Sequence, residues 1–146
     1  MPILDEIATL IAGATVAGLP GTAASTASGW LMFKSHLPDS TAIPNKCIGL
    51  IEEIGQGVMG RVEMEMPGLS VVIRGEPANS TESTPYATAQ AKMTQTRDVL
   101  HGYTGSTGTS SVHYAGIWVQ NSGFLGFDES WRPLFTIGCR ILKATT

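Results

Sequence analysis

Residues 84–102, TPYATAQAKMTQTRDVLHG, contain the clearest helix pattern in the chain. The residues expected on one face recur every seven positions in two adjoining rows, which are Tyr86, Met93 and Leu100, and Ala89, Thr96 and Tyr103. Thr84 is a suitable N-cap, Pro85 suits the first helical position, and Gly102 can end the helix. The sequence therefore predicts a helix over 85–101 with one buried face.

A second helix is predicted at the start of the chain. Its apolar residues have helical spacing and form one stripe, made of Ile3, Leu4, Ile7, Leu10 and Ile11. Pro2 fits the first turn, and Asp5 and Glu6 favour the positive end of the helix dipole. Residues 13–29 are mostly Ala, Gly, Ser and Thr without either period, which predicts the tail of the helix and then a loop.

The remaining apolar segments predict strands. Residues 30–37 and 47–53 are expected to be neighbouring antiparallel strands, and a further strand is expected over 69–75. The segment 56–68 between them is either a long loop or an extended hairpin.

The chain after the second helix predicts two more strands. Residues 105–111 are expected to be a flexible linker, followed by a strand over 112–119 and a turn at Asn121-Ser122-Gly123. The final strand, 134–142, alternates Phe135, Ile137, Cys139 and Ile141 on one face. The whole chain, 1–146, is thus expected to form one α+β domain, a mostly antiparallel sheet of about five strands packed by two helices.

Composition limits the classes of function. The chain is 42% hydrophobic and only 14% charged, which indicates a surface poor in charge and covered in part by partners. Its net charge of −3 gives no basic surface of the kind that binds nucleic acid tightly. Acidic residues near the N-terminus and the lack of a long apolar run predict a protein that is neither exported nor membrane-bound. Cys47 and Cys139 lie in apolar runs and are expected to be buried free thiols.

No group of residues predicts catalysis, a cofactor or a metal. His36, His101 and His113 lack metal-ligand spacing, and no serine lies in a G-x-S-x-G pattern. The glycines at 102, 105 and 108 follow a helix instead of leading into one, so they do not predict a phosphate site.

Two charged segments carry other expectations. Asp128 and Glu129 are adjacent and would point apart in a strand, so a structural turn held by a carboxylate contact to Arg132 is favoured over acid–base chemistry. Methionines alternate with glutamates over residues 59–66, and Met59, Glu63, Met64, Glu65 and Met66 are candidates for partner contact. A place for these methionines in the core remains an equal alternative.

An ordered set of motifs resembles the minor capsid and tail terminator proteins of long-tailed bacteriophages. The C-terminal part of this set comprises Tyr86-Ala87 with Ala89 and Ala91, Leu100-His101-Gly102, Tyr114-Ala115-Gly116-Ile117, Leu125-Gly126-Phe127-Asp128-Glu129 and Arg132-Pro133-Leu134-Phe135. Leu37-Pro38-Asp39 and Ile48-Gly49-Leu50-Ile51-Glu52 are similar to the first hairpin of the family. The chain departs from the family in its Ala/Ser/Thr stretch before Trp30 and at Gly116.

The resemblance implies a structural virion protein made in the host cytoplasm and placed at the neck of the tail. It implies a homo-hexameric ring that ends growth of the tail tube, contacts the major tail tube protein and the head–tail connector or stopper, and lets genomic DNA pass. Another neck or tail ring protein, such as a head-closure or tube subunit, is the near alternative. A small-molecule-binding or enzymatic domain is the distant one.

The lumen of such a ring is expected to be acidic or neutral, because basic residues would hold passing DNA. The candidates to line it are some of Glu52, Glu53, Glu63, Glu65 and Glu76.

Overall fold

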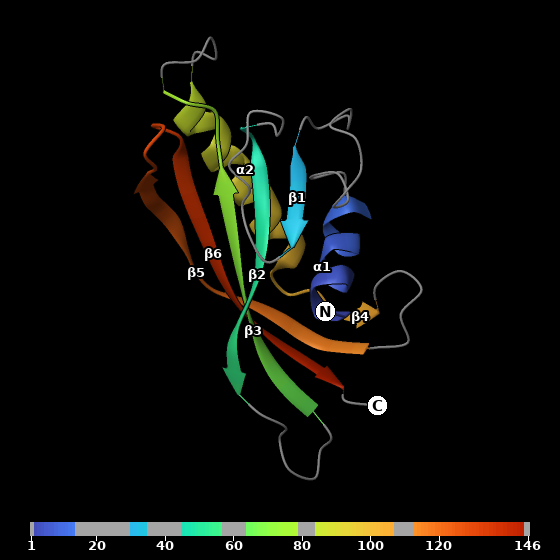
Figure 1. Cartoon of the computed structure of the whole chain (residues 1–146). Helices are drawn as coiled ribbons and strands as arrows, with labels where there is room; N and C mark the ends of the chain where they lie inside the picture. The colour runs from blue at the N-terminus through green and yellow to red at the C-terminus, as the bar shows by residue number, and fades with distance from the viewer. Residues whose placement is uncertain are drawn as a thin grey trace.

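The computed structural model describes residues 2–13, 30–34, 45–56, 64–78, 84–106 and 113–144. Within these ranges two helices pack on one six-stranded, mostly antiparallel sheet, which confirms the predicted α+β class (Figure 1). The elements in chain order are α1 (Pro2–Gly13), β1 (Leu31–Lys34), β2 (Cys47–Gln56), β3 (Met64–Arg74), α2 (Pro85–Leu100), β4 (Gly105–Ser106), β5 (His113–Phe127) and β6 (Pro133–Ala144). The sixth strand is the two-residue β4, in a segment predicted to be a linker.

The order of strands across the sheet is β1-β2-β3-β6-β5-β4. β1 and β2 are neighbours, as expected, but they run parallel, so the prediction of an antiparallel pair was wrong. The connection over residues 35–46 is longer than a hairpin turn, and parallel neighbours need a long connection that returns the chain to the same end. All other neighbouring strands are antiparallel.

β5 and β6 form the longest hairpin of the sheet. The predicted turn at Asn121-Ser122-Gly123 was wrong, because β5 continues through these residues to Phe127. The register shifts at three places along β5, one of them between Val119 and Asn121, so the strand absorbs extra residues in bulges instead of reversing. The chain reverses only after Phe127, at residues 128–132.

The β2–β3 pair is the extended hairpin that the sequence left open as one alternative. Its register runs from Cys47 opposite Arg74 to Gln56 opposite Met66, with an irregularity between Glu53 and Gln56. β3 therefore starts at Met64, before the predicted residue 69.

The core lies between one face of the sheet and both helices. It contains Leu4, Ile7, Ala8 and Ile11 of α1, Ala89, Met93 and Leu100 of α2, and inward residues of β1, β2, β3, β5 and β6. The predicted alternation in β6 is confirmed, since Phe135, Ile137, Cys139 and Ile141 are all buried. Cys47 and Cys139 are buried and free, as expected.

The ends of α2 agree with the sequence in part. Pro85 occupies the first turn and Gly102 adopts φ 80°, a conformation that favours glycine. Thr84 holds the N-cap position but makes no side-chain capping hydrogen bond, so that expectation was wrong. Its φ of −140° and ψ of 64° depart from the usual extended cap geometry, in which the hydroxyl reaches a backbone N–H of the first turn.

Candidate interaction surface

Five large apolar side chains are exposed at the end of the β5–β6 hairpin. Their exposed fractions are Tyr86 42%, Phe124 44%, Leu125 61%, Phe127 45% and Trp131 64%. We call these five residues the aromatic edge. Large apolar side chains gathered on a surface mark interaction sites more often than singly exposed ones do.

The rings of the aromatic edge form a continuous chain from the core to the surface. Buried Phe135 lies 5.1 Å from Tyr86 and 5.3 Å from Phe124, between ring centroids. Phe124 lies 5.3 Å from Phe127, which lies 6.1 Å from Trp131. Because each ring packs on the next, the exposed rings are held in place by the core.

A bulge in β5 places these rings together. In a regular strand, Phe124 and Phe127 would point to opposite faces, since they are an odd number of residues apart. The register shift between Phe124 and Gly126 sets Phe124 opposite Phe135 and Phe127 opposite Pro133, which share one face of β6. Gly126 adopts φ 130°, which side chains rarely allow, so this glycine permits the bulge.

The turn that follows is held by Asp128 and Arg132, the pair that the sequence singles out. Asp128 Oδ2 accepts a hydrogen bond of 2.7 Å from Arg132 Nε, and Oδ1 accepts bonds of 2.9 Å from the backbone N–H groups of Ser130 and Arg132. Burial alone would raise the pKa of the Asp128 carboxyl, but the hydrogen bonds and the charge of Arg132 outweigh it and lower that pKa. Glu129 is exposed.

This turn presents Trp131 to solvent. Trp131 has φ 61°, a left-handed conformation that is unfavourable for a bulky residue. Its N–H donates to the Asp128 carbonyl over 3.0 Å, and its carbonyl accepts from Ala78 N–H over 2.9 Å. The strained backbone is thus fixed from both sides, which is how such conformations persist at functional positions.

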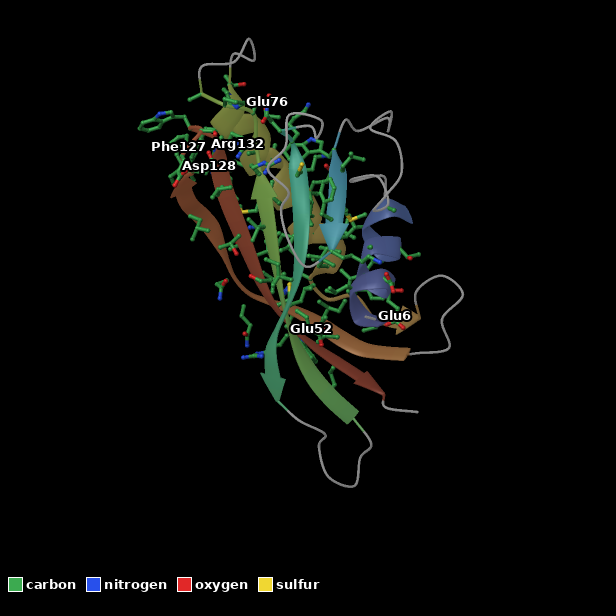
Figure 2. The ribbon with its side chains drawn as sticks, in the orientation of Figure 1. Glu6, Glu52, Glu76, Phe127, Asp128 and Arg132 are labelled. Atoms are coloured by element: carbon green, nitrogen blue, oxygen red, sulfur yellow. The ribbon has the colours of Figure 1, made fainter. Side chains whose placement is uncertain are left out.

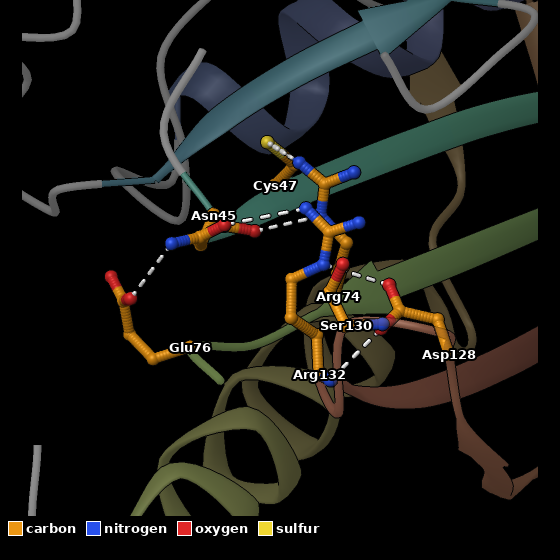
Figure 3. Close-up of polar contacts among 7 residues, drawn as sticks. All are labelled: Asn45, Cys47, Arg74, Glu76, Asp128, Ser130 and Arg132. Atoms are coloured by element: carbon orange, nitrogen blue, oxygen red, sulfur yellow. Dashed lines mark hydrogen bonds and ion pairs between the residues drawn. The ribbon is translucent and has the colours of Figure 1, made fainter. Parts of the chain in front are cut away.

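A buried polar network anchors the turn to the sheet (Figure 3). Arg132, 7% exposed, donates from Nη1 to Asn45 Oδ1 over 3.3 Å. Arg74, 3% exposed, donates to the Asn45 carbonyl over 2.9 Å and to Cys47 Sγ over 3.3 Å. Asn45 donates in turn to Glu76 over 3.2 Å. The network joins the start of β2, the end of β3 and the turn, so polar contacts tie the turn that carries Trp131 to the sheet.

Two lysines lie over Trp30, the residue before the edge strand β1. The ammonium groups of Lys46 and Lys92 lie 5.8 Å and 5.5 Å from the centre of the Trp30 ring, which is itself buried. Burial, followed by the charge of Lys46, lowers the pKa of Lys92. Lys92 Nζ also donates a hydrogen bond of 2.8 Å to Gln95 Oε1. We call Lys46 and Lys92 the lysine pair.

Two surface hollows lie beside β5. One, of about 450 Å³, is lined by residues from the end of α2 and from 119–122, and includes His101. His101 is exposed and its Nδ1 accepts a hydrogen bond of 3.0 Å from Val119 N–H, which is a structural role. The other, of about 310 Å³, is lined mainly by polar and small residues of β3, β5 and β6. Among the described residues, no three His, Cys, Asp or Glu side chains are placed to hold a metal.

The structure describes only part of the segment that the sequence singles out for partner contact. Met59, Glu63 and His36 lie outside the described residues. The backbone of Met64, Glu65 and Met66 lies in β3, with Glu65 opposite Lys143 of β6. The proposed contact of this segment with a partner remains a prediction.

Four of the five candidate lumen glutamates lie among the described residues: Glu52, Glu53 and Glu65 lie toward one end of the β2–β3 hairpin, and Glu76 lies beyond its other end. Glu52 is exposed and pairs with Leu69 in β3, whereas Glu76 follows the far end of that strand. Leu69 and Glu76 are seven residues apart, which corresponds to roughly 20 Å along an extended strand. Figure 2 shows Glu52 and Glu76 toward different ends of the molecule. Glu53 belongs to β2 and Glu65 to β3.

The aromatic edge was missed in the sequence analysis. Tyr86 was assigned to the buried face of α2, and residues 121–123 were assigned to a turn, which hid the continuation of β5. The signal was present in Phe124, Leu125, Phe127 and Trp131, four large apolar residues within a polar and glycine-containing stretch.

Comparisons with known proteins bear on the fold. No family model matches the chain, and no curated protein matches it. A chain in the solved structure described as "Virion of native gene transfer agent (GTA) particle" matches with a TM-score of 0.56 and 14% sequence identity, covering 77% of each chain. The two chains therefore share their fold. No helix in the described part of this chain is long and apolar enough to cross a membrane.

Proposed function

We propose that this chain is a structural subunit of a phage-like particle and acts through protein–protein contacts. The observation that carries the proposal is the fold shared with a chain of a gene transfer agent virion. The aromatic edge supports it, because an exposed apolar surface whose rings pack on the core suits assembly. The hollow at the end of α2 is lined by Arg97, Asp98 and His101, but Arg97 lies 3.6 Å from Asp98 and His101 accepts a hydrogen bond from Val119 N–H, so these groups have structural partners and chemistry has no comparable support.

Within that class we propose the role of a tail terminator. Such a subunit forms a homo-hexameric ring on the last ring of the tail tube, stops tube growth and offers the surface that joins the head. The motifs of residues 86–135 that resemble tail terminator proteins support this role. The partners would be further copies of the chain, the major tail tube protein and the head–tail connector or stopper.

Genomic DNA would pass through this ring without tight binding. Six copies carry a formal charge of −18, six times −3, which disfavours phosphate contacts. The candidate lumen residues stay those named from the sequence, which include Glu52 and Glu76.

The alternative is another neck or tail ring protein, because small α+β ring subunits share one fold and fold does not fix function. Deleting the gene in the producing strain separates the roles. Loss of a terminator should give tails of uncontrolled length that do not join filled heads. Loss of a head-closure protein should leave tails of normal length, and loss of a tube subunit should leave no tails. Electron micrographs of the particles distinguish the three results, and normal joined particles would overturn the proposal.

A further inference from the structure

The two ends of one row across the sheet carry complementary surfaces. The row is traced by the pairing of Leu31 with Cys47, Cys47 with Arg74, Arg74 with Leu134 and Leu134 with Gly126. Gly126 lies inside the aromatic edge, and Leu31 follows Trp30, on which the lysine pair lies. The end of β5 and the start of β1, near which the aromatic edge and the lysine pair lie, are therefore at the same level of the molecule and toward opposite edges of the sheet (Figure 1).

Both surfaces also lie on the same face of the sheet. Phe124 pairs with Phe135 and contacts Tyr86 of α2, so it is on the face that the helices cover. Trp30 belongs to the same core cluster as both helices, and Lys92 is a residue of α2. A lateral neighbour in the same orientation would bring one surface to the other.

The charges of the two surfaces are opposite. At the aromatic edge Arg132 is buried against Asp128, which leaves Glu129 as the exposed charge of the turn. Near the other edge, the ammonium groups of Lys46 and Lys92 lie 5.8 Å and 5.5 Å from the centre of the same Trp30 ring, and burial followed by the charge of Lys46 lowers the pKa of Lys92, so an approaching carboxylate would relieve repulsion there. Aromatic rings next to ammonium groups add cation–π attraction.

The strand directions fit this arrangement. β1 is parallel to β2, and three antiparallel pairings separate β2 from β5, so β1 and β5 are antiparallel within one chain. Copies placed side by side in the same orientation would set β5 of one against β1 of the next in the antiparallel sense, which is the more stable arrangement. Such a contact joins different surfaces, and repeated contacts of this kind close into rings when the rotation permits.

From these observations we propose that copies of this chain join head to tail, with the aromatic edge of one copy on the lysine pair of the next and Glu129 facing Lys46 and Lys92. The inference rests on the proposed function, since it names the contact by which the ring is built. The inference is narrower than the proposed function, because it specifies one pair of contacting surfaces. That contact can be wrong even if the chain forms a ring.

Disulfide trapping tests the contact directly. The double variant E129C/K46C of the full chain, oxidised at high concentration, should give a ladder of covalent multimers. Cys47 and Cys139 are buried, and burial raises the pKa of both thiols, that of Cys139 to about 12, so they should not react. Each single variant, E129C or K46C, should give no ladder. Covalent dimers of E129C alone would overturn the proposal, because they would show a symmetric contact.

Charge exchange gives an independent test. E129K should reduce cross-linked or native multimers about tenfold, as should F127S, and the exchange E129K/K46E should restore much of the loss. W118S is the matched control, because Trp118 is 44% exposed but pairs with Arg140, away from the aromatic edge. Thermal unfolding checks that each variant is folded. If F127S does not fold, the cysteine pair decides, because it retains every aromatic ring.

The outcomes separate this proposal from the proposed function. A missing ladder together with averaged particle images that still show this chain in a ring would overturn the contact and leave the function standing. A chain absent from the particles would overturn the function, whatever the cross-links show.

Discussion

At the scale of single residues, the contact between Asp128 and Arg132 organises the surface that we propose for assembly. One carboxylate satisfies two backbone N–H groups and one guanidinium N–H, while the arginine is almost wholly buried. Removing the partner of a buried charge lowers the stability of the fold, whereas removing an exposed charge nearby changes it little. The sequence contained enough information to predict this contact, because its spacing fits a turn and Arg132 was the nearest cation.

The first prediction follows from that asymmetry. Asp128→Ala should destabilise the fold by about 2–4 kcal/mol, less than a fully buried pair would lose because Arg132 keeps its bond to Asn45. Glu129→Ala, one residue away and exposed, should change stability by less than about 0.5 kcal/mol. Urea unfolding of both variants measures the difference. Equal effects would show that the turn does not depend on the Asp128 carboxylate.

The same carboxylate predicts a pH dependence. The pKa of Asp128 is lower in the folded chain than its ordinary value of 3.8, so its contribution to stability is present above that value. The contribution is lost as the pH falls through the lowered pKa. Asp128→Asn lacks this titration, so the stability advantage of the wild-type chain over the variant should be constant near neutral pH and shrink below about pH 4. Urea midpoints of both proteins measured from about pH 7 to about pH 2 test this. A stability advantage of the wild-type chain that persists unchanged to the lowest pH would contradict the prediction.

At the scale of elements, the sequence was informative where one period continues without interruption. α2 and β6 each keep one pattern over most of their length, and both lie where the pattern predicted, although Tyr86 is partly exposed. β5 failed because its bulges move the alternation by one residue, and Asn121-Ser122-Gly123 has the composition of a turn. The direction of β1 failed because local composition does not report strand direction. The aromatic edge was missed because of the bulges in β5.

The packing of α2 on the sheet gives an element-scale prediction. A Cβ at Gly75 would lie 3.0 Å from Ala89 Cβ, 3.0 Å from Pro133 Cγ and 3.3 Å from the Pro85 carbonyl, so Gly75→Ala should push the start of α2 from β3 and β6. We expect a loss of about 1–3 kcal/mol. Gly123→Ala is the matched control, since a Cβ there would meet nothing within 4 Å. Thermal unfolding compares them, and a neutral Gly75→Ala would mean that this interface is loose.

The β2–β3 hairpin gives the second prediction at this scale. Its β3 arm begins with Met64, Glu65 and Met66, which the sequence nominates for contact with the tail tube. Met64→Ser with Met66→Ser should leave the subunit folded and weaken capping of tails, because adaptable apolar side chains would be lost from the contact. Tail lengths in micrographs and a thermal unfolding curve provide the measurements. Normal capping by a folded double variant would place the tube contact elsewhere.

At the scale of the whole molecule, charge distribution decides how DNA would meet a ring of these chains. The chain has 9 Lys and Arg against 12 Asp and Glu, and the structure lowers the number of usable cations further. Arg74 and Arg132 are buried in the polar network, where they cannot reach a phosphate. The lysine pair is partly buried against Trp30. A conduit benefits from this, because each phosphate contact adds affinity that would slow the passage of a duplex.

We therefore expect no measurable binding of duplex DNA at physiological salt. Tight binding would need several basic groups on one surface, and burial withdraws two arginines from that role. Fluorescence anisotropy with a labelled duplex, measured from about 50 to 200 mM salt, tests the expectation. Glu52→Lys adds a cation at an exposed position and serves as a comparison. Any binding of duplex DNA by this variant should weaken as the salt concentration rises. Sub-micromolar, salt-sensitive binding by the wild-type chain would contradict a passive conduit and favour a subunit that grips DNA.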